Sequence, residues 1–141
     1  MRLVLAALVG LVAFTITGTL ATPAWARYAA IVVEAESGRV LYERNADTRN
    51  YPASLTKMMT LYIVFEAVEN GEIGLDDRVT ISRHAASEPP SRLGLRAGQK
   101  IRLRYLIRAA AVRSANDAAT ALAEAIEGSE ARFARRMNRT A

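Results

Sequence analysis

Two short motifs contain side chains that could carry out nucleophilic catalysis, and the first is the run SLTK at residues 54–57. Ser54 and Lys57 are three residues apart, so in the first turn of a helix they share a face and can touch. A serine hydroxyl is a poor nucleophile until a base takes its proton, and a lysine amine can be that base when it is desolvated or lies beside another cation. The spacing therefore fits a Ser–Lys nucleophile pair.

The second motif is the run SAN at residues 114–116, which also precedes an expected helix. The Ser114 hydroxyl could relay a proton between the lysine and a leaving group. The Asn116 amide can both donate and accept hydrogen bonds, so it could hold Lys57 and a substrate amide. The two motifs together predict one catalytic site.

Each of these residues also has an ordinary structural explanation. Ser54, Ser114 and Asn116 are typical helix N-caps. Lys57 could be a solvated charge, or its stem could lie along an apolar surface. Asp117 is expected to interact with the positive end of a helix rather than to act as a catalytic acid. The motifs alone leave catalysis and capping both open.

Composition excludes several other kinds of site. The chain has 141 residues and no cysteine, so disulfides, thiolate catalysis and cysteine-bound metals are excluded. It has a single histidine, His84, and no Gly-x-Ser-x-Gly turn, so a Ser-His-Asp hydrolase is disfavoured. With 51% hydrophobic residues the chain is expected to form one globular domain. Its net charge of +5 comes from dispersed arginines, so we expect no nucleic acid as a partner.

The first 26 residues have the pattern of a secretory signal peptide. Arg2 precedes an apolar run at 3–20, and the small-x-small triplet Ala24-Trp25-Ala26 comes before Arg27. An uncleaved membrane anchor is the alternative, because 18 apolar residues are borderline for spanning a bilayer. In either case we expect the remainder to be exported.

The remaining chain shows a hairpin followed by helices. Strands are expected at 28–35 and 39–44, and a helix is expected from Ser54 to about Val68. That helix is apolar around most of its circumference, so we expect it to be buried inside a larger body. The hairpin is too small to cover it, so we expect the chain to be incomplete at its carboxyl end. The other expected elements are short strands at 79–81 and 101–103, a helical turn at 82–87, and helices at 105–112, at 116–126 and from Ser129.

Residues 30–62 and 114–138 strongly resemble the low-molecular-mass D-alanyl-D-alanine carboxypeptidases, which are penicillin-recognising enzymes with an active-site serine. The resemblance implies an α/β (α+β) architecture, the β-lactamase-like fold in which helices flank an antiparallel sheet. Residues 27–141 would then be the amino-terminal part of the catalytic domain. The resemblance also implies a location in the periplasm, with association at the periplasmic face of the inner membrane.

The same resemblance implies a role for each motif residue. Ser54 would attack the penultimate D-Ala carbonyl of a peptidoglycan stem peptide ending in D-Ala-D-Ala. Lys57 would be the general base, Ser114 would relay protons, and Asn116 would position the substrate and Lys57. β-Lactams would acylate the same serine, and neither a metal nor an organic cofactor is expected.

The sequence departs from the family pattern in one motif. The family has a Lys-Thr-Gly motif on a later strand, but Lys100 is not followed by Thr-Gly. We therefore expect this chain to be a truncated member of the family. Without the third motif, its activity as a carboxypeptidase is not assured. The alternatives are a serine β-lactamase-like protein, which would need a group such as a glutamate to hydrolyse the acyl-enzyme, and a non-catalytic exported fragment that binds cell-wall peptide.

Overall fold

The computed structural model describes residues 28–141. The predicted signal peptide at 1–26 lies outside the described residues. The chain divides between Asn50 and Tyr51 into two compact units.

The first unit contains the predicted β-hairpin. Strands β1 (Ala30–Val33) and β2 (Val40–Arg44) pair antiparallel, with Val32 opposite Tyr42 and a register shift after Val32. The connecting turn has Gly38 at φ +69°, a left-handed conformation that glycine adopts without steric cost. The prediction of a hairpin around this turn is confirmed.

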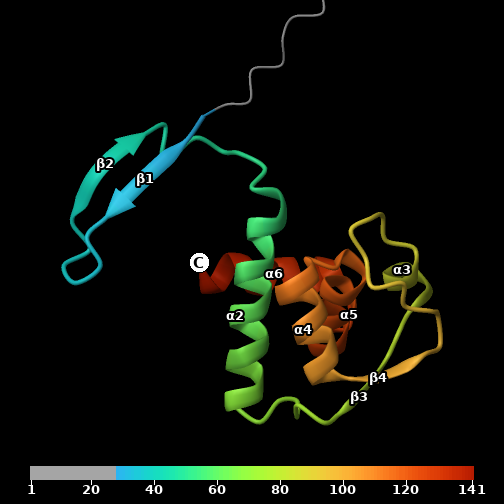
Figure 1. Ribbon diagram of the computed structural model, residues 1–141. Helices are drawn as coiled ribbons and strands as arrows, with labels where there is room; N and C mark the ends of the chain where they lie inside the picture. Colours follow the sequence, from blue (N-terminus) through green and yellow to red (C-terminus); the bar gives the residue numbers. More distant parts are fainter. Residues whose placement is uncertain (1–27) are drawn as a thin grey trace, which may run out of the picture. The chain divides into compact units, whose positions relative to one another are not determined.

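The second unit is a group of helices with a short antiparallel ladder at one edge (Figure 1). Helices α4 and α6 both pack against α5, and all three contact α2. Strand β3 pairs with β4, with Val79 opposite Ile101. The elements are the 3-10 helix η1 (Ala53–Leu55), α2 (Thr56–Glu69), β3 (Arg78–Thr80), α3 (Arg83–Ala86), β4 (Lys100–Arg102), α4 (Leu103–Arg113), α5 (Asn116–Glu127) and α6 (Glu130–Thr140).

The core of this unit lies between α4 and α5. Small residues of α5 allow close approach of the neighbouring helices, and larger side chains from the other elements fill the space around them. A second, smaller cluster joins α2 to α6 through Ile63 and Phe133. The fully buried larger side chains are Ile63, Val64, Ile81, Leu103, Leu106, Leu122 and Asp117. The core therefore holds α5, which begins at Asn116, against α2, which contains Lys57.

The sequence predicts an apolar helix that these residues are too few to cover, and within residues 51–141 only part of the circumference of α2 is buried. Ile63, Val64 and Ala67 are buried against the other helices. Met58 and Tyr62, which point to another side, are 68% and 59% exposed. The three contacting helices pack on part of the circumference only, and the rest of the apolar surface is left open.

Two helix boundaries differ from the prediction. Ser54 lies in η1 and α2 begins at Thr56, so Ser54 and Lys57 are not both in the first turn of one α-helix. Helix α4 begins at Leu103 rather than at 105, because the Leu103 amide donates to the Asp77 carbonyl and its side chain is fully buried. The other predicted strands and helices are confirmed within a residue or two at each end.

The described part of the chain has no helix that is both long and apolar enough to span a bilayer.

Arg136 of α6 ties three elements together through carboxylates. Its Nη1 lies 2.7 Å from Glu72 and 3.4 Å from Glu127, and its Nη2 lies 3.5 Å from Glu66. The hydrogen bonds to Glu72 hold the pKa of the guanidinium above its ordinary value, and those same bonds lower the pKa of Glu72. The side chain is only 15% exposed, so solvent screens this network less than it would a surface pair.

The substitution Arg136→Met is expected to lower the free energy of unfolding by about 1–3 kcal/mol, because three carboxylates would then face one another without a cation. The measurement is the midpoint of urea unfolding. Arg135→Met is the matched control, since Arg135 is exposed, and it should change the unfolding free energy by less than about 0.5 kcal/mol. Equal effects of the two substitutions would contradict this account of the network.

Candidate active site

The two predicted serines meet at the start of α2. Ser114 Oγ lies 2.8 Å from Ser54 Oγ and donates a hydrogen bond to it. Each hydroxyl can be donor or acceptor, so the same contact can pass a proton in either direction. The two motifs are 60 residues apart in sequence, and the fold brings them within hydrogen-bond distance.

The backbone at both sides of this contact is left-handed. Ser114 has φ +52° and ends α4, and Ala53, directly before Ser54, has φ +48°. A residue with a Cβ adopts this region at a cost of about 1 kcal/mol, and such conformations gather at functional sites where the surrounding structure enforces them. One hydroxyl thus belongs to a residue with a strained backbone, Ser114, and the other, that of Ser54, directly follows one.

Neither serine has the capping role that was the alternative explanation. Leu55 is the N-cap of α2 and Ala115 is the N-cap of α5, and neither helix start has a side-chain cap bond. Asn116 is the first residue of α5 rather than its cap. The capping interpretation of Ser54, Ser114 and Asn116 is therefore wrong.

Lys57 is partly buried and lies beside Asn116. Its Nζ donates a 2.7 Å hydrogen bond to Asn116 Oδ1. Within residues 28–141, Lys57 and Ser54 do not hydrogen-bond to each other. The four predicted residues thus form two pairs, Ser54 with Ser114 and Lys57 with Asn116, and residues 114 and 116 come from one short turn.

The loop before residue 92 fixes the orientation of Asn116. The backbone amide of Asn116 donates to the Ser91 carbonyl at 2.7 Å, and Asn116 Nδ2 donates to the Pro89 carbonyl at 3.0 Å. Because Nδ2 is occupied in this way, Oδ1 is the atom that faces Lys57. Ser91 Oγ also donates to the Arg113 carbonyl, so the loop is bound on both sides of Ser114.

Asp117 is the residue at this site whose role the sequence did not reveal. It is fully buried, and its carboxylate accepts hydrogen bonds from the backbone amides of Leu93, Gly94 and Leu95 at 2.8–3.0 Å. Burial by itself would raise the pKa of Asp117, but these amides outweigh it and the pKa lies below its ordinary value. As expected, Asp117 lies in the first turn of α5 and accepts from the Ala118 amide there. It also fixes the loop that orients Asn116. One signal in the sequence was available. The apolar residue Ala121 lies one helical turn after Asp117, and residues four apart share a helix face, so Asp117 is on the inward face of α5.

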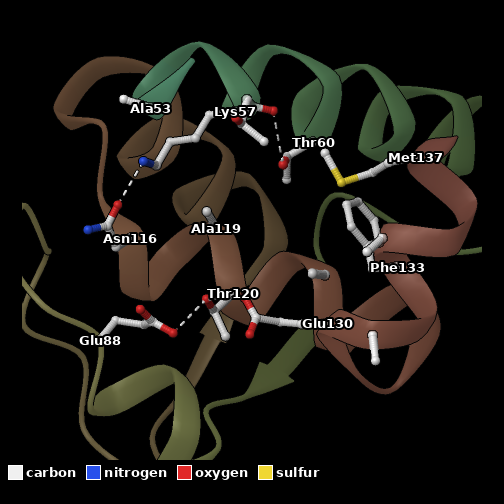
Figure 2. Close-up of a pocket in the computed structure, with 14 residues that line it drawn as sticks. Ala53, Lys57, Thr60, Glu88, Asn116, Ala119, Thr120, Glu130, Phe133 and Met137 are labelled. Atoms are coloured by element: carbon white, nitrogen blue, oxygen red, sulfur yellow. Dashed lines mark hydrogen bonds between the residues drawn. The ribbon is translucent and has the colours of Figure 1, made fainter. Parts of the chain in front are cut away.

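A cavity of about 460 Å³ opens beside Lys57. Figure 2 shows the Lys57–Asn116 pair at the upper left, with Glu88, Thr120 and Glu130 below it. Phe133 and Met137 form part of an apolar wall. The lining residues are Ala53, Thr56, Lys57, Thr60, Glu88, Asn116, Ala119, Thr120, Ala123, Glu130, Ala131, Phe133, Ala134 and Met137. This cavity is wide enough to hold part of a peptide next to the lysine.

His84 and Lys100 do not belong to this group of residues. His84 is exposed, and its Nε2 is 2.7 Å from Glu130 Oε2. That hydrogen bond raises the pKa of His84 above its ordinary value. Lys100 is exposed on β4. The chemistry that the arrangement can perform therefore rests on Ser54, Lys57, Ser114 and Asn116.

Comparison with known proteins gives one consistent result. The sequence pattern of the D-alanyl-D-alanine carboxypeptidase family matches residues 17–141. The D-alanyl-D-alanine carboxypeptidase DacF of Bacillus subtilis is 40% identical over 112 residues, which are 79% of this chain and 29% of that protein. The chain thus spans less than a third of the length of this relative.

Solved structures agree in fold. The crystal structure of the D-alanyl-D-alanine carboxypeptidase DacD from Francisella tularensis superposes with a TM-score of 0.74 at 40% identity, over 79% of this chain and 27% of that one. Penicillin-binding protein D2 from Listeria monocytogenes, solved in its ampicillin-bound form, gives 0.60 at 35% identity, over 79% of this chain and 44% of that one. The predicted penicillin-recognising fold with antiparallel strands and flanking helices is confirmed. With the family pattern matched along most of the sequence, the chain belongs to the D-alanyl-D-alanine carboxypeptidase family.

Proposed function

We propose that this chain acts as a serine-type D-Ala-D-Ala carboxypeptidase on peptidoglycan stem peptides. The observation that carries the proposal is the contact between Ser54 and Ser114, with the Lys57–Asn116 pair beside it. The four residues come from two distant motifs, and two of them, Lys57 and Asn116, line the cavity. Family membership supplies the reaction class.

The reaction proceeds in two steps. Ser54 Oγ attacks the carbonyl carbon of the penultimate D-Ala while its proton passes to Lys57, directly or through Ser114. The peptide bond breaks, the terminal D-Ala leaves with a proton on its amine, and an ester remains on Ser54. Water then hydrolyses this ester, which releases the shortened peptide and restores the serine hydroxyl.

Asn116 contributes by holding the base. Its Oδ1 accepts from Lys57 and its position is fixed by Pro89 and Ser91. Such fixed positioning of a catalytic group lowers the entropic part of the barrier. No metal or organic cofactor takes part in this scheme.

β-Lactams are the proposed covalent inhibitors. The strained lactam carbonyl can be attacked by Ser54 in the same way as the D-Ala carbonyl, and the Listeria relative has been solved with ampicillin bound. Because the comparisons name carboxypeptidases, the β-lactamase alternative has no observation in its favour.

The proposed location is the periplasm, at the periplasmic face of the inner membrane. The pattern at residues 1–26 supports export. The proposed substrate supports the same compartment, since peptidoglycan lies outside the inner membrane.

The proposal predicts a covalent adduct with a penicillin. The purified chain, incubated with benzylpenicillin, is expected to gain the mass of one penicillin molecule in intact-mass spectrometry, and Ser54→Ala is expected to abolish the gain. Ser37→Ala is the matched control, because Ser37 is an exposed serine on the hairpin turn. It should acylate as the unchanged chain does.

Two outcomes would contradict the proposal. One is the absence of an adduct on the unchanged chain, which would favour a non-catalytic role in binding cell-wall peptide. The other is an adduct that survives in Ser54→Ala. The sequence has no Lys-Thr-Gly motif, so the same measurement tests whether the first two motifs form a reactive site. Release of D-Ala from a synthetic peptide ending in D-Ala-D-Ala then tests the second step.

A further inference from the structure

A cluster of metal-ligating side chains includes two residues of the cavity lining, Glu88 and Glu130, and the neighbouring His84. His84 comes from α3, Glu88 follows that helix by two residues, and Glu130 is the first residue of α6. His84 Nε2 lies 2.7 Å from Glu130 Oε2 and 3.8 Å from Glu88 Oε1. One ligand atom of each residue lies within 4.8 Å of both others. Two segments of the chain, 84–88 and the start of α6, thus converge on one point.

A single hydroxyl lies between the two carboxylates. Thr120 Oγ1 lies 3.1 Å from Glu88 Oε1 and 3.1 Å from Glu130 Oε1. A hydroxyl has one proton, so it can donate to only one of these oxygens at a time. Glu88 is the less exposed of the two carboxylates, with a side chain 20% exposed.

The charge at the cluster is also unbalanced. Among the described residues, His84 is the only basic side chain in ion-pair contact with Glu88 or Glu130. A protonated imidazole would supply one positive charge against two negative ones. A divalent cation would balance both carboxylates and leave the imidazole neutral, as a metal ligand must be.

We propose that His84, Glu88 and Glu130 form a binding site for a divalent transition-metal ion, with zinc as the best fit. One imidazole nitrogen and two carboxylate oxygens are ligands that zinc accepts, and three protein ligands leave a fourth position for water. Magnesium and calcium prefer oxygen ligands throughout, so the imidazole discriminates against them.

The geometry needs only small side-chain rotations to hold the ion. Zinc binds nitrogen and oxygen at about 2.0–2.2 Å, so its ligand atoms lie roughly 3–4 Å apart. His84 and Glu130 are 57% and 49% exposed at their side chains, and both can turn without disturbing the core. Among the described residues, His84, Glu88 and Glu130 do not hydrogen-bond to Lys57 or Asn116 through their side chains. The zinc site does not depend on the proposed carboxypeptidase activity.

Titration calorimetry with zinc chloride tests the proposal directly. The chain has one histidine and no cysteine, so a tag-free preparation offers zinc few competing ligands. The unchanged chain is expected to bind one zinc ion, whereas His84→Ala and Glu130→Gln should each weaken binding at least tenfold. Glu69→Gln is the matched control, because Glu69 is an exposed carboxylate at the end of α2, and it should bind as the unchanged chain does. Magnesium chloride should give no saturable binding.

A thermal-unfolding series gives an independent readout. A metal that binds the folded state raises its melting temperature, so zinc should stabilise the unchanged chain and Glu69→Gln but not His84→Ala or Glu130→Gln. Circular dichroism of each variant establishes that it is folded. The proposal is overturned if the folded, unchanged chain binds no zinc, or if zinc binds the two ligand variants as tightly as the control.

Discussion

Lys57→Arg is expected to slow the formation of the benzylpenicillin adduct at least about a hundredfold. A positioned general base contributes about 10²–10⁴ to the rate, and arginine cannot give up its proton at any accessible pH. Arginine keeps the positive charge and can still donate to Asn116 Oδ1, which is the observed partner of Lys57. The substitution therefore removes the proposed base and retains the charge.

The chain provides a matched control for this substitution in its only other lysine. Lys100 is exposed on β4 and lies outside the cavity lining. Lys100→Arg should acylate at the unchanged rate, which is measured by quenching the reaction at intervals and reading the intact mass. If Lys57→Arg reacted as fast as Lys100→Arg, Lys57 would not be the base and the proton of Ser54 would need another acceptor.

Local sequence signals predicted most of the elements in this fold. The hairpin follows from β-branched residues on both sides of a turn with Gly38, and α6 follows from Ser129, whose side chain accepts from the Arg132 amide as a cap. Such signals act over a few residues and are readable from sequence. The exposed side of α2 was not predictable in the same way, because periodicity shows that a helix is apolar but not which neighbours cover it.

The sequence motifs predicted which residues lie near one another but not the contacts they make, and their catalytic roles stay a prediction. The motifs identified Ser54, Lys57, Ser114 and Asn116, and the four lie together. The expected direct pairing of Ser54 with Lys57 assumed a single α-helix, whereas a 3-10 turn contains Ser54. Which hydroxyl faces which partner depends on backbone conformations such as the left-handed Ser114. Those conformations result from long-range packing and carry no local signature in a serine.

The role of Asp117 shows the same limit. Three of its four backbone donors come from residues 93–95, more than 20 positions earlier, and no spacing rule connects them to Asp117. Only the fold brings this loop over the start of α5. A buried carboxylate with several amide donors then becomes one of the most sensitive positions in the chain.

Asp117→Asn is expected to lower the free energy of unfolding by about 2–4 kcal/mol, because hydrogen bonds to a buried charged acceptor contribute about 1.5–3 kcal/mol each and unsatisfied amides cost about 1–3. An asparagine amide has nearly the same shape, but its NH2 group would face backbone donors that the carboxylate now satisfies. The measurement is the urea unfolding midpoint at pH 7. Asp76→Asn is the matched control, because Asp76 is exposed and paired only with Arg102 and Arg104. It should cost less than about 1 kcal/mol.

The pH dependence of the difference in unfolding free energy between the unchanged chain and Asp117→Asn tests whether the ionised carboxylate of Asp117 causes it. The pKa of Asp117 is lowered in the folded state, so its charge stabilises the fold above the ordinary aspartate pKa of about 3.9, and this contribution is lost as the pH falls toward the lowered value. The gap between the unchanged chain and Asp117→Asn should therefore be constant from neutral pH down to about pH 4 and shrink below it. A gap that stayed the same in acid would show that shape and packing, rather than the charge on Asp117, hold the loop at 93–95. Asn116 would then owe its orientation to the carbonyls of Pro89 and Ser91 alone.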